Sequence, residues 1–257
     1  MTRFGLIGCG LKHTLSPLIH NARFADKKIS AQYSVVDLSE NMLTRDVLND
    51  FDGLNVTIPY KQKVMSLLDE TEDTAFKIGA VNTIVNNGVL KGYNTDLQGF
   101  LHIVNRCGAK LDKNVLVLGY GGVAQTVLYA VKNAGGRATV VTRRHDLNSE
   151  DVTYVGYDDK VLTNKFDLIV NCTPVGMYPN QGACPLKNFN ATCVIDLIYN
   201  PAITKFLTLA EQKGITFCGG LEMLVVQALE SEKLWLGIDY DENDILKLKN
   251  VCLEALI

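Results

Sequence analysis

A chain of 257 residues with 47% hydrophobic content is long enough to bury the core of one or two domains. Its net charge of −3 gives it no general attraction for nucleic acid, and no motif combines aromatic with basic residues. We find no charged-then-apolar leader and no apolar run long enough to cross a membrane. The composition therefore predicts a soluble enzyme without a nucleic-acid or membrane partner.

The cysteines indicate the redox environment. There are seven, an odd number, and none forms a Cys-x-x-Cys pair. An even set in a small secreted chain would indicate disulfides, and paired motifs would indicate zinc. We expect reduced, mostly buried thiols, no metal site and a cytoplasmic location.

Strands and helices alternate along the first hundred residues. Ser16 followed by Pro17 is a good helix start, with the serine as cap. Alternation of this kind predicts an α/β fold with mostly parallel sheets. The predicted elements are strands near 3–8, 31–36, 52–56 and 81–85 and helices near 17–27, 39–49, 60–68 and 96–107.

A second series begins at about residue 114, where a buried strand runs into a glycine turn and a helix. Gly119 would make the tight turn, and Gly121 would let backbone N–H groups approach a pyrophosphate. Gly122 and Ala124 would keep the next helix, 123–134, close to the sheet. The pattern alone fits an ordinary strand-to-helix turn equally well.

Two arginines after the next strand favour a particular dinucleotide. The strand is predicted at 138–142, and Arg143 and Arg144 follow it. An acidic residue here would bind the ribose 2′-hydroxyl of NAD, whereas arginine suits the 2′-phosphate of NADP. The alternative is a solvated pair of surface charges. Further strands are predicted at 167–171 and 193–197, and the chain from 220 onward is predicted to be helical.

Polar residues in the first half of the chain occur where turns meet strand ends. Ligands of open α/β sheets collect beyond the carboxyl ends of strands, so these side chains could converge on one cleft. Each also has a purely structural interpretation, as a helix cap, a turn residue or a surface charge. The residues concerned are Thr14, Ser16, Lys61, Asn82, Thr95 and Asp96.

Several motifs match in order, and through them the chain resembles the shikimate dehydrogenase family from end to end. So many ordered matches are far more specific than any one of them. They are Gly5-Leu-Ile-Gly8, His13-Thr-Leu-Ser-Pro17, Gly53-Leu-Asn-Val-Thr-Ile-Pro-Tyr-Lys61, Gly79-Ala-Val-Asn-Thr83, Gly92-Tyr-Asn-Thr-Asp-Leu-Gln-Gly99, Gly119-Tyr-Gly-Gly122, Asn171-Cys-Thr-Pro-Val-Gly-Met177, Asp196-Leu-Ile-Tyr-Asn-Pro201 and Met223-Leu-Val-Val-Gln-Ala228.

The resemblance implies an N-terminal α/β substrate domain, a Rossmann NADP domain and a C-terminal helix that returns to the first domain. We place the substrate-binding catalytic domain at 1–97 and 220–257, and the NADP-binding domain at 98–219. Catalysis would occur in the cleft between them. We expect a monomer or a homodimer.

The implied reaction is reversible hydride transfer between the C3 hydroxyl of shikimate and NADP, giving 3-dehydroshikimate in aromatic amino acid (chorismate) biosynthesis. Lys61 matches the catalytic lysine of the family and Asp96 its partner carboxylate, and the sequence leaves open which of them transfers the proton. The implied substrate residues are Thr14, Ser16, Thr57, Asn82, Thr95, Tyr199 and Gln227. The implied cofactor residues are Gly119, Gly121, Gly122, Ala124, Arg143, Arg144, Thr173 and Met223.

Some positions depart from the usual family pattern. Thr14 stands where serine is commoner, Tyr120 replaces a small residue in the glycine turn, and Glu222 stands where glycine is frequent. Two alternatives remain beside the main interpretation. One is a quinate or shikimate dehydrogenase paralogue with broader substrate use or with NAD, and the other is a catalytically silent nucleotide-binding regulatory module. The presence of both Lys61 and Asp96 argues against a silent module.

Overall fold

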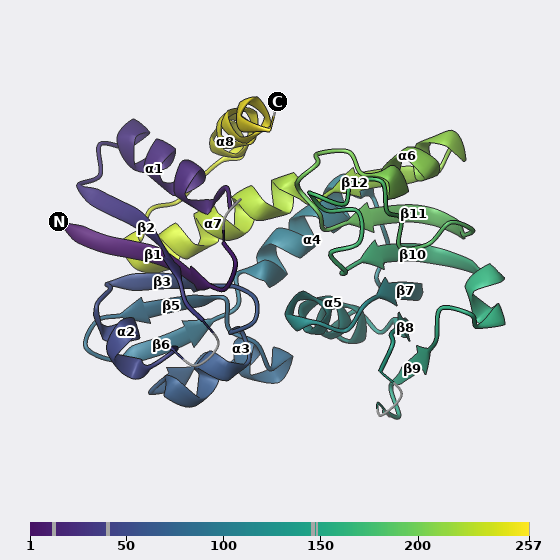
Figure 1. The fold of residues 1–257 in the computed structure, drawn as a ribbon, viewed down its shortest axis with the longest axis horizontal. Helices are drawn as coiled ribbons and strands as arrows, with labels where there is room; N and C mark the ends of the chain where they lie inside the picture. Colours follow the sequence, from purple (N-terminus) through teal and green to yellow (C-terminus); the bar gives the residue numbers. More distant parts are fainter. Residues whose placement is uncertain (12–13, 40–41, 145–146, 148, 257) are drawn as a thin grey trace. The chain divides into compact units, whose positions relative to one another are not determined.

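The computed structural model describes residues 1–11, 14–39, 42–144, 147 and 149–256. The chain divides into two compact units, each with one six-stranded sheet and helices (Figure 1). Unit 1 comprises Met1–Gln98 and Val225–Ala255, and unit 2 comprises Gly99–Leu224. This confirms the α/β fold class.

The sheet of unit 1 has the strand order β2-β1-β3-β5-β6-β4. Strand β1 is parallel to β2 and β3, whereas β5 is antiparallel to both β3 and β6. The elements that belong wholly to this unit are β1 (Thr2–Gly8), α1 (Ser16–Asp26), β2 (Ala31–Asp37), α2 (Arg45–Asn49), β3 (Gly53–Val56), the 3₁₀ helix η1 (Lys63–Leu67), β4 (Glu70–Thr71), α3 (Asp73–Ile78), β5 (Thr83–Asn86), β6 (Leu90–Tyr93) and α8 (Glu242–Ala255).

The expectation of mostly parallel pairing is wrong in the middle of this sheet. Only residues 87–89 separate β5 from β6. So short a connection can join only antiparallel strands, because parallel strands need a long crossover. Gly88 has φ 93°, and its N–H donates to Asn86 Oδ1 at 3.1 Å. Asn87-Gly88, inside this connection, is a strong hairpin signal in the sequence.

Three predicted helix features also need correction. The helix expected at 39–49 is confined to α2, because Thr44 has an extended backbone (φ −129°, ψ 163°); residues 40–41 lie outside the described part. The helix expected at 60–68 is the short 3₁₀ helix η1. Ser16 is not the cap of α1, since Leu15 holds that position and Ser16 already lies in the helix.

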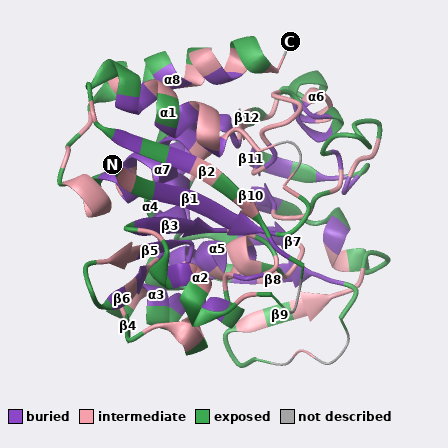
Figure 2. Ribbon diagram, turned by 60° about the vertical axis from the view of Figure 1, so that its left-hand side comes forward, coloured by how far each residue is buried: buried purple, intermediate pink, exposed green. Residues whose placement is uncertain are grey.

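Helices cover both faces of the unit 1 sheet (Figures 1 and 2). Alternate side chains of β1 point to opposite faces, so Phe4 and Leu6 pack in one core cluster and Ile7 in another. On the first face Trp235 of α7 (Leu221–Leu236) stacks on Phe4, with ring centroids 4.7 Å apart. On the second face Leu48 of α2 packs in the cluster with Ile7. The C-terminal helical stretch is therefore two helices, α7 and α8, with a break at 237–241.

Unit 2 has an all-parallel sheet of order β12-β11-β10-β7-β8-β9. Read from β9, this is the strand order 3-2-1-4-5-6 of doubly wound dinucleotide-binding sheets, and the order reverses between β7 and β10. Its strands are β7 (Asn114–Leu118), β8 (Arg137–Val141), β9 (Val152–Val155), β10 (Lys165–Asn171), β11 (Asn190–Asp196) and β12 (Thr216–Gly219), and its helices are α5 (Gly122–Asn133), η2 (Lys160–Thr163) and α6 (Lys205–Gln212). Helix α4 (Asp96–Cys107) begins in unit 1 and continues into unit 2.

A buried charge cluster ties α1 to α7 and α8 in unit 1. Glu232 accepts hydrogen bonds from His20 Nδ1 at 2.7 Å and from Arg23 Nε at 3.2 Å. Arg23 also pairs with Asp244 at 2.5 Å, and Lys27 reaches the same oxygen at 3.0 Å. His20, Arg23 and Glu232 are each at most 2% exposed. The three helices are thus joined by charged groups, of which His20, Arg23 and Glu232 are shielded from water and Lys27 is 37% exposed.

The ionisation of Asp244 should make the free energy of unfolding depend on pH. Burial alone would raise its pKa, but hydrogen bonds from Lys27 and Arg23 outweigh burial and lower the pKa below 3.8. A lowered pKa adds stability that is present above the unfolded-state value and is lost as pH falls through the folded-state value. Asp244→Asn should therefore cost about 1–3 kcal/mol at pH 7 and progressively less below pH 4, by urea unfolding. An equal cost at pH 7 and below pH 4 would show that the pKa of Asp244 is not lowered by its ion pairs.

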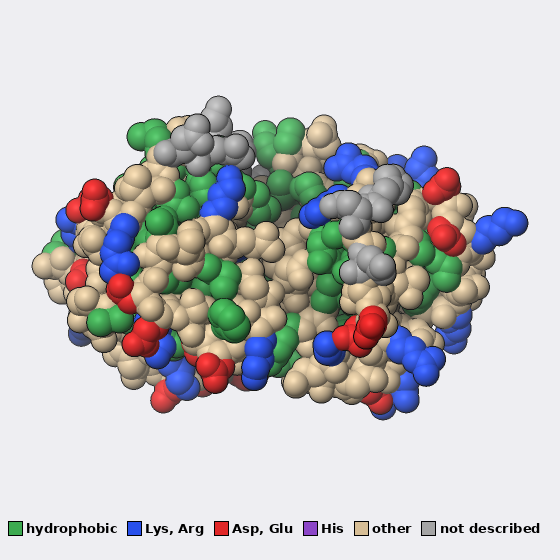
Figure 3. Space-filling model, turned by 90° about the horizontal axis from the view of Figure 1, so that it is seen from below, with side chains coloured by type: hydrophobic (Ala, Val, Ile, Leu, Met, Phe, Trp, Pro, Cys, Tyr) green, Lys and Arg blue, Asp and Glu red, His purple; other side chains and the backbone are tan. Residues whose placement is uncertain are grey.

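The seven cysteines are free thiols, of which Cys107, Cys193 and Cys252 are buried and Cys9 is exposed. The sulfur atoms of Cys107 and Cys193 lie 2.9 Å apart, and this contact raises the pKa of Cys107 to about 12. Over the described residues, no helix has the length and apolar character needed to cross a membrane. On the face seen in Figure 3, Lys and Arg side chains are interspersed with Asp and Glu.

Candidate active site

The predicted polar residues of unit 1 gather at one edge of its sheet. The carboxyl ends of β1 and β3 lead to Ser16 and Lys61 respectively. Strand β5 is antiparallel to these strands, so Asn82, just before it, lies at the same edge. Strand β6 runs back to this edge and delivers Asp96. In the sheet, β2 and β3 lie on opposite sides of β1, so the strand order reverses at β1. Open α/β sheets bind ligands at such a reversal.

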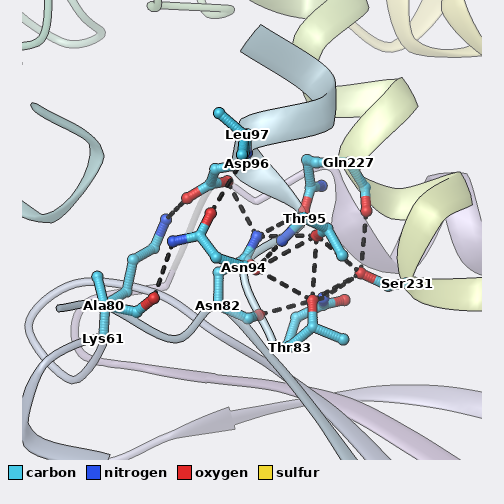
Figure 4. A network of polar contacts seen from close by, with 11 residues as sticks. Lys61, Ala80, Asn82, Thr83, Asn94, Thr95, Asp96, Leu97, Gln227 and Ser231 are labelled. Atoms are coloured by element: carbon cyan, nitrogen blue, oxygen red, sulfur yellow. Dashed lines mark hydrogen bonds and ion pairs between the residues drawn. The ribbon is translucent and has the colours of Figure 1, made fainter. Parts of the chain in front are cut away.

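Lys61 and Asp96 form an ion pair at this edge (Figure 4). Lys61 Nζ lies 2.5 Å from Asp96 Oδ2, and the side chains are 14% and 8% exposed. The backbone carbonyl of Lys61 accepts the N–H of Val81 at 2.8 Å, which holds Lys61 next to the segment that leads into β5. A cation and a carboxylate that are both partly shielded from water can exchange a proton with a bound substrate.

The amide of Asn82 connects this pair to the surrounding polar groups. Its Oδ1 accepts the backbone N–H of Thr95 at 2.7 Å, so its Nδ2 must face the other way. That Nδ2 lies 3.0 Å from Asp96 Oδ1, 3.0 Å from Thr95 Oγ1 and 3.4 Å from Gln227 Oε1. The buried Asn82 amide thus brings together three other predicted substrate or catalytic residues, Thr95, Asp96 and Gln227.

The hydroxyls of Thr14 and Ser16 lie at the start of α1. Thr14 Oγ1 donates to Ser16 Oγ at 3.3 Å and accepts the backbone N–H of Ser16 at the same distance. Ser16 also hydrogen-bonds the hydroxyl of Tyr33, whose pKa burial raises well above its ordinary value. Tyr33 in turn donates to Asn55 Oδ1 at 2.7 Å. His13, which belongs to the same motif, lies outside the described residues.

Four residues of this polar network carried no predicted role: Tyr33, Asn55, Thr83 and Ser231. Asn55 and Thr83 stand inside quoted motifs, and Ser231 follows Gln227 by one helical turn on α7, which places both on one helix face. Thr57, at the end of β3, is half-buried and lies against Gly8 of β1. Tyr199 belongs to unit 2, in the segment after β11.

In unit 2 the glycine turn follows β7, and Thr173 follows β10, the two strands between which the order reverses. Gly119 has φ 94°, and a Cβ there would lie 2.7 Å from Thr173 Cγ2. Asn171 Oδ1 accepts both the N–H (3.0 Å) and the hydroxyl (2.7 Å) of Thr173, which fixes the loop. Only glycine fits at Gly119, because of the backbone conformation and the neighbouring loop.

The N-terminus of α5 fits a phosphate group. Gly121 holds the N-cap position with φ −107° and ψ −170°, and a Cβ there would meet no atom within 4 Å. Glycine cannot cap the first-turn N–H groups with a side chain, and the first turn contains no acidic residue. Gly122 begins the helix, and Ala124 is fully buried against the sheet side. An anion at this end would supply the missing acceptor.

The two arginines after β8 are exposed, next to a group of tyrosines. The Arg144 guanidinium lies 5.9 Å from the ring centre of Tyr120, and the Tyr120 ring meets Tyr154 edge-on at 5.5 Å. Burial and a hydrogen bond with Tyr120 raise the pKa of Tyr154 to about 12. Burial raises the pKa of Tyr157, and the positive charge of Arg143 partly opposes this rise. Tyr120 is therefore engaged with neighbours on the strand β9 side of the turn.

Comparison with known proteins identifies the family. Residues 6–84 match the model of the shikimate dehydrogenase substrate binding domain. The chain is 41% identical to a shikimate dehydrogenase (NADP(+)) of Clostridium beijerinckii, over 94% of both chains. It is 37% identical to the protein of the same name from Caldanaerobacter subterraneus, over 93% of both. The chain belongs to the shikimate dehydrogenase family. The resemblance expected from the motifs is confirmed.

Solved structures of the shikimate dehydrogenase family share the whole fold. The chorismate mutase/shikimate 5-dehydrogenase fusion protein of Clostridium acetobutylicum matches with a TM-score of 0.93 and 36% identity, covering 100% of this chain and 98% of that one. Shikimate 5-dehydrogenase of Thermus thermophilus, solved with NADP(H) and shikimate, matches with a TM-score of 0.86 and 30% identity, covering 98% of this chain and 100% of that one.

One departure from the usual shikimate dehydrogenase pattern has a clear structural role. Glu222, in the first turn of α7, accepts hydrogen bonds from His102 Nε2 and Arg106 Nε, both at 2.8 Å. Both partners lie on α4, so the carboxylate joins the two helices inside unit 2. Met223, the next residue, is buried.

Proposed function

We propose that this protein is an NADP-dependent shikimate dehydrogenase. It catalyses reversible hydride transfer between the C3 hydroxyl of shikimate and NADP, giving 3-dehydroshikimate, a step of aromatic amino acid biosynthesis. The observation that carries the proposal is the Lys61–Asp96 pair, 2.5 Å apart and held by Asn82. A protein that only bound nucleotide would have no use for such a pair.

The two units divide the work in this proposal. The first, with boundaries at 1–97 and 220–257, binds the substrate and carries the proton-transfer groups. The second, 98–219, binds the cofactor. The polar edge of the unit 1 sheet and the strand reversal of the unit 2 sheet support this division.

NADP, when bound, supplies the hydride acceptor for substrate oxidation. Oxidation of a secondary alcohol also releases the hydroxyl proton, which needs a base near that oxygen. We assign this role to Lys61: its neutral amine accepts the hydroxyl proton during oxidation, and in ketone reduction the ammonium form returns a proton to the substrate oxygen. Both Asp96 oxygens already accept hydrogen bonds, from Lys61 and Asn82, so Asp96 orients the lysine and stabilises its charged form.

Substrate recognition follows from the remaining groups of unit 1. Thr14 and Ser16 present hydroxyls at the start of α1, suited to a carboxylate, with Tyr199 of unit 2 as a further candidate. A polyhydroxy substrate suits the amide and hydroxyl groups, because a wrong substrate leaves a buried group unpaired at a cost of about 1–3 kcal/mol. The residues proposed to bind the ring hydroxyls are Thr57, Asn82, Thr95, Asp96 and Gln227.

For the cofactor we propose that the glycine turn, Gly119, Gly121, Gly122 and Ala124, receives the pyrophosphate at the N-terminus of α5. Arg143 and Arg144 would bind the 2′-phosphate. Thr173 and Met223 would lie along the ribose and nicotinamide. The open space at Gly121 and the contact of Thr173 with the turn support these roles.

Arg143 should decide between the two nicotinamide cofactors. Arg143→Ala should raise the KM for NADP about tenfold or more, and that for NAD by less than about twofold, because only NADP carries the 2′-phosphate. Initial rates with each cofactor measure this. Arg137→Ala, at the exposed opposite end of β8, is the matched control and should change neither value. Equal weakening of both cofactors would remove the 2′-phosphate assignment.

An initial-rate matrix of shikimate and quinate against NADP and NAD tests the proposed function. Shikimate with NADP should give the highest kcat/KM. A comparable or higher rate with quinate, or with NAD, would instead identify a broad-specificity paralogue. No turnover in any combination, with NADP binding retained, would identify a regulatory module.

We also propose a cytoplasmic enzyme that is a monomer or a homodimer. The free thiols support a reducing compartment. Light scattering of the purified protein, coupled to size-exclusion chromatography, tests the oligomeric state.

A further inference from the structure

Ser231 is a fully buried hydroxyl within the polar network of unit 1 (Figure 4). It lies on α7, one turn after Gln227, and is 0% exposed. Its Oγ lies 2.8 Å from Asn55 Nδ2, 2.9 Å from Thr83 Oγ1 and 3.2 Å from Thr95 Oγ1. Because it is fully buried, Ser231 cannot touch a substrate and acts only through these neighbours.

Three hydrogen bonds around Ser231 have a definite direction. Burial keeps the Tyr33 hydroxyl protonated, and this hydroxyl donates to Asn55 Oδ1 at 2.7 Å. Asn55 Nδ2 therefore faces Ser231 and donates to it. The proton of Ser231 goes to the backbone carbonyl of Gln227 at 2.9 Å. A hydroxyl oxygen has two lone pairs, so the Ser231 oxygen accepts from Asn55 and from one threonine hydroxyl, of which Thr83 at 2.9 Å is the nearer.

The two threonines carry this order to the candidate catalytic groups. Thr83 Oγ1 lies 3.2 Å from Asn82 Oδ1 and 3.1 Å from Thr95 Oγ1. Thr95 Oγ1 accepts from Asn82 Nδ2 at 3.0 Å, and the same nitrogen donates to Asp96 Oδ1 at 3.0 Å. Without the Ser231 oxygen, Asn55 Nδ2 and the threonine hydroxyls would need other acceptors. They would then disturb the hydrogen bonds that hold the Asn82 amide in place.

We propose that Ser231 is a positioning residue for the dehydrogenase reaction. It fixes the hydroxyls of Thr83 and Thr95, and through them the Asn82 amide that orients Asp96 and reads the substrate. This inference rests on the proposed function, and it adds a residue that lies outside the substrate site.

A double-mutant cycle tests this role. Ser231→Ala should lower kcat/KM for shikimate about tenfold, since a misoriented amide weakens transition-state contacts. The KM for NADP should stay within about twofold of the wild-type value. Asn82→Ala should have a larger effect, of about a hundredfold. The double variant should match Asn82→Ala within about twofold, because Ser231 acts through Asn82.

Ser34→Ala is the matched control, since Ser34 is a half-buried serine of β2 in the same unit and outside this network. It should leave all rates unchanged. If Ser231→Ala does not fold, Ser231→Cys keeps the volume but offers a weak acceptor, and the same loss is expected.

Two results would overturn the inference: a serine variant with kcat/KM within about twofold of the wild type, or losses that multiply fully in the double variant. Failure of the proposed function would look different, because the wild-type protein itself would then not turn over shikimate.

Discussion

Replacing Lys61 with alanine is expected to lower kcat for shikimate oxidation by about 10²–10⁴-fold and to leave the KM for shikimate almost unchanged. The reason is that proton transfer stabilises the transition state and contributes little to ground-state binding. Lys61 Nζ lies 2.5 Å from Asp96, and alanine removes both the proton acceptor for the oxidation and the partner of a shielded carboxylate. Initial rates with saturating NADP measure kcat and KM separately.

Lys63→Ala is the matched control for this experiment. Lys63 is exposed, two residues further along in η1, and its loss should leave kcat within about twofold of the wild-type value. An increase in KM alone for Lys61→Ala would make Lys61 a binding residue, and the acid–base role would then pass to Asp96.

Glu232→Ala is expected to have the largest effect on stability, lowering the free energy of unfolding by about 3–5 kcal/mol. The carboxylate is 1% exposed and is shared by His20 and Arg23, which are themselves buried. Removing it leaves His20 without this partner and Arg23 with Asp244 as its remaining carboxylate. Breaking a buried pair costs more than the pair contributes, because one charge stays buried and uncompensated.

Urea unfolding followed by tryptophan fluorescence measures this effect in unit 1 specifically. Trp235 is the only tryptophan of the chain, and it packs on Phe4 with its ring 5.5 Å from that of His20. Glu254→Ala, at an exposed position of α8, is the control and should cost less than about 0.5 kcal/mol. A cost below about 1 kcal/mol for Glu232→Ala would mean that water replaces the carboxylate.

Neither Glu232 nor its partners could be predicted from the sequence. His20 and Arg23 lie on α1, more than 200 residues before Glu232, and nothing local marks them as a pair. Periodicity predicts only that this part of α7 faces the core. The meeting of these three side chains follows from the return of α7 to the first sheet, which local patterns do not contain.

The candidate site was predictable where its residues follow strand ends. Lys61 follows the strand predicted at 52–56, and ligands of open α/β sheets are expected beyond such a strand end. Asn82 precedes its strand and reaches the same edge only because β5 is antiparallel to β3, and β6, which leads to Asp96, was not among the predicted strands. The glycine turn of unit 2 was predictable for the same reason, since a buried strand, a tight turn and a helix are adjacent in sequence. Family motifs then added the chemistry.

The sequence by itself determined the α/β class, the repeated series of strands and helices, and the residues most suited to proton transfer and phosphate binding. Tertiary structure alone decided the burial of Glu232 and the place of Ser231 in the polar network. The physical reason is the distance along the sequence between the interacting residues. A turn or a strand end depends on neighbours within a few residues, whereas the bond from Asn55 to Ser231 spans 176 positions and exists only because α7 packs beside β3 and β5.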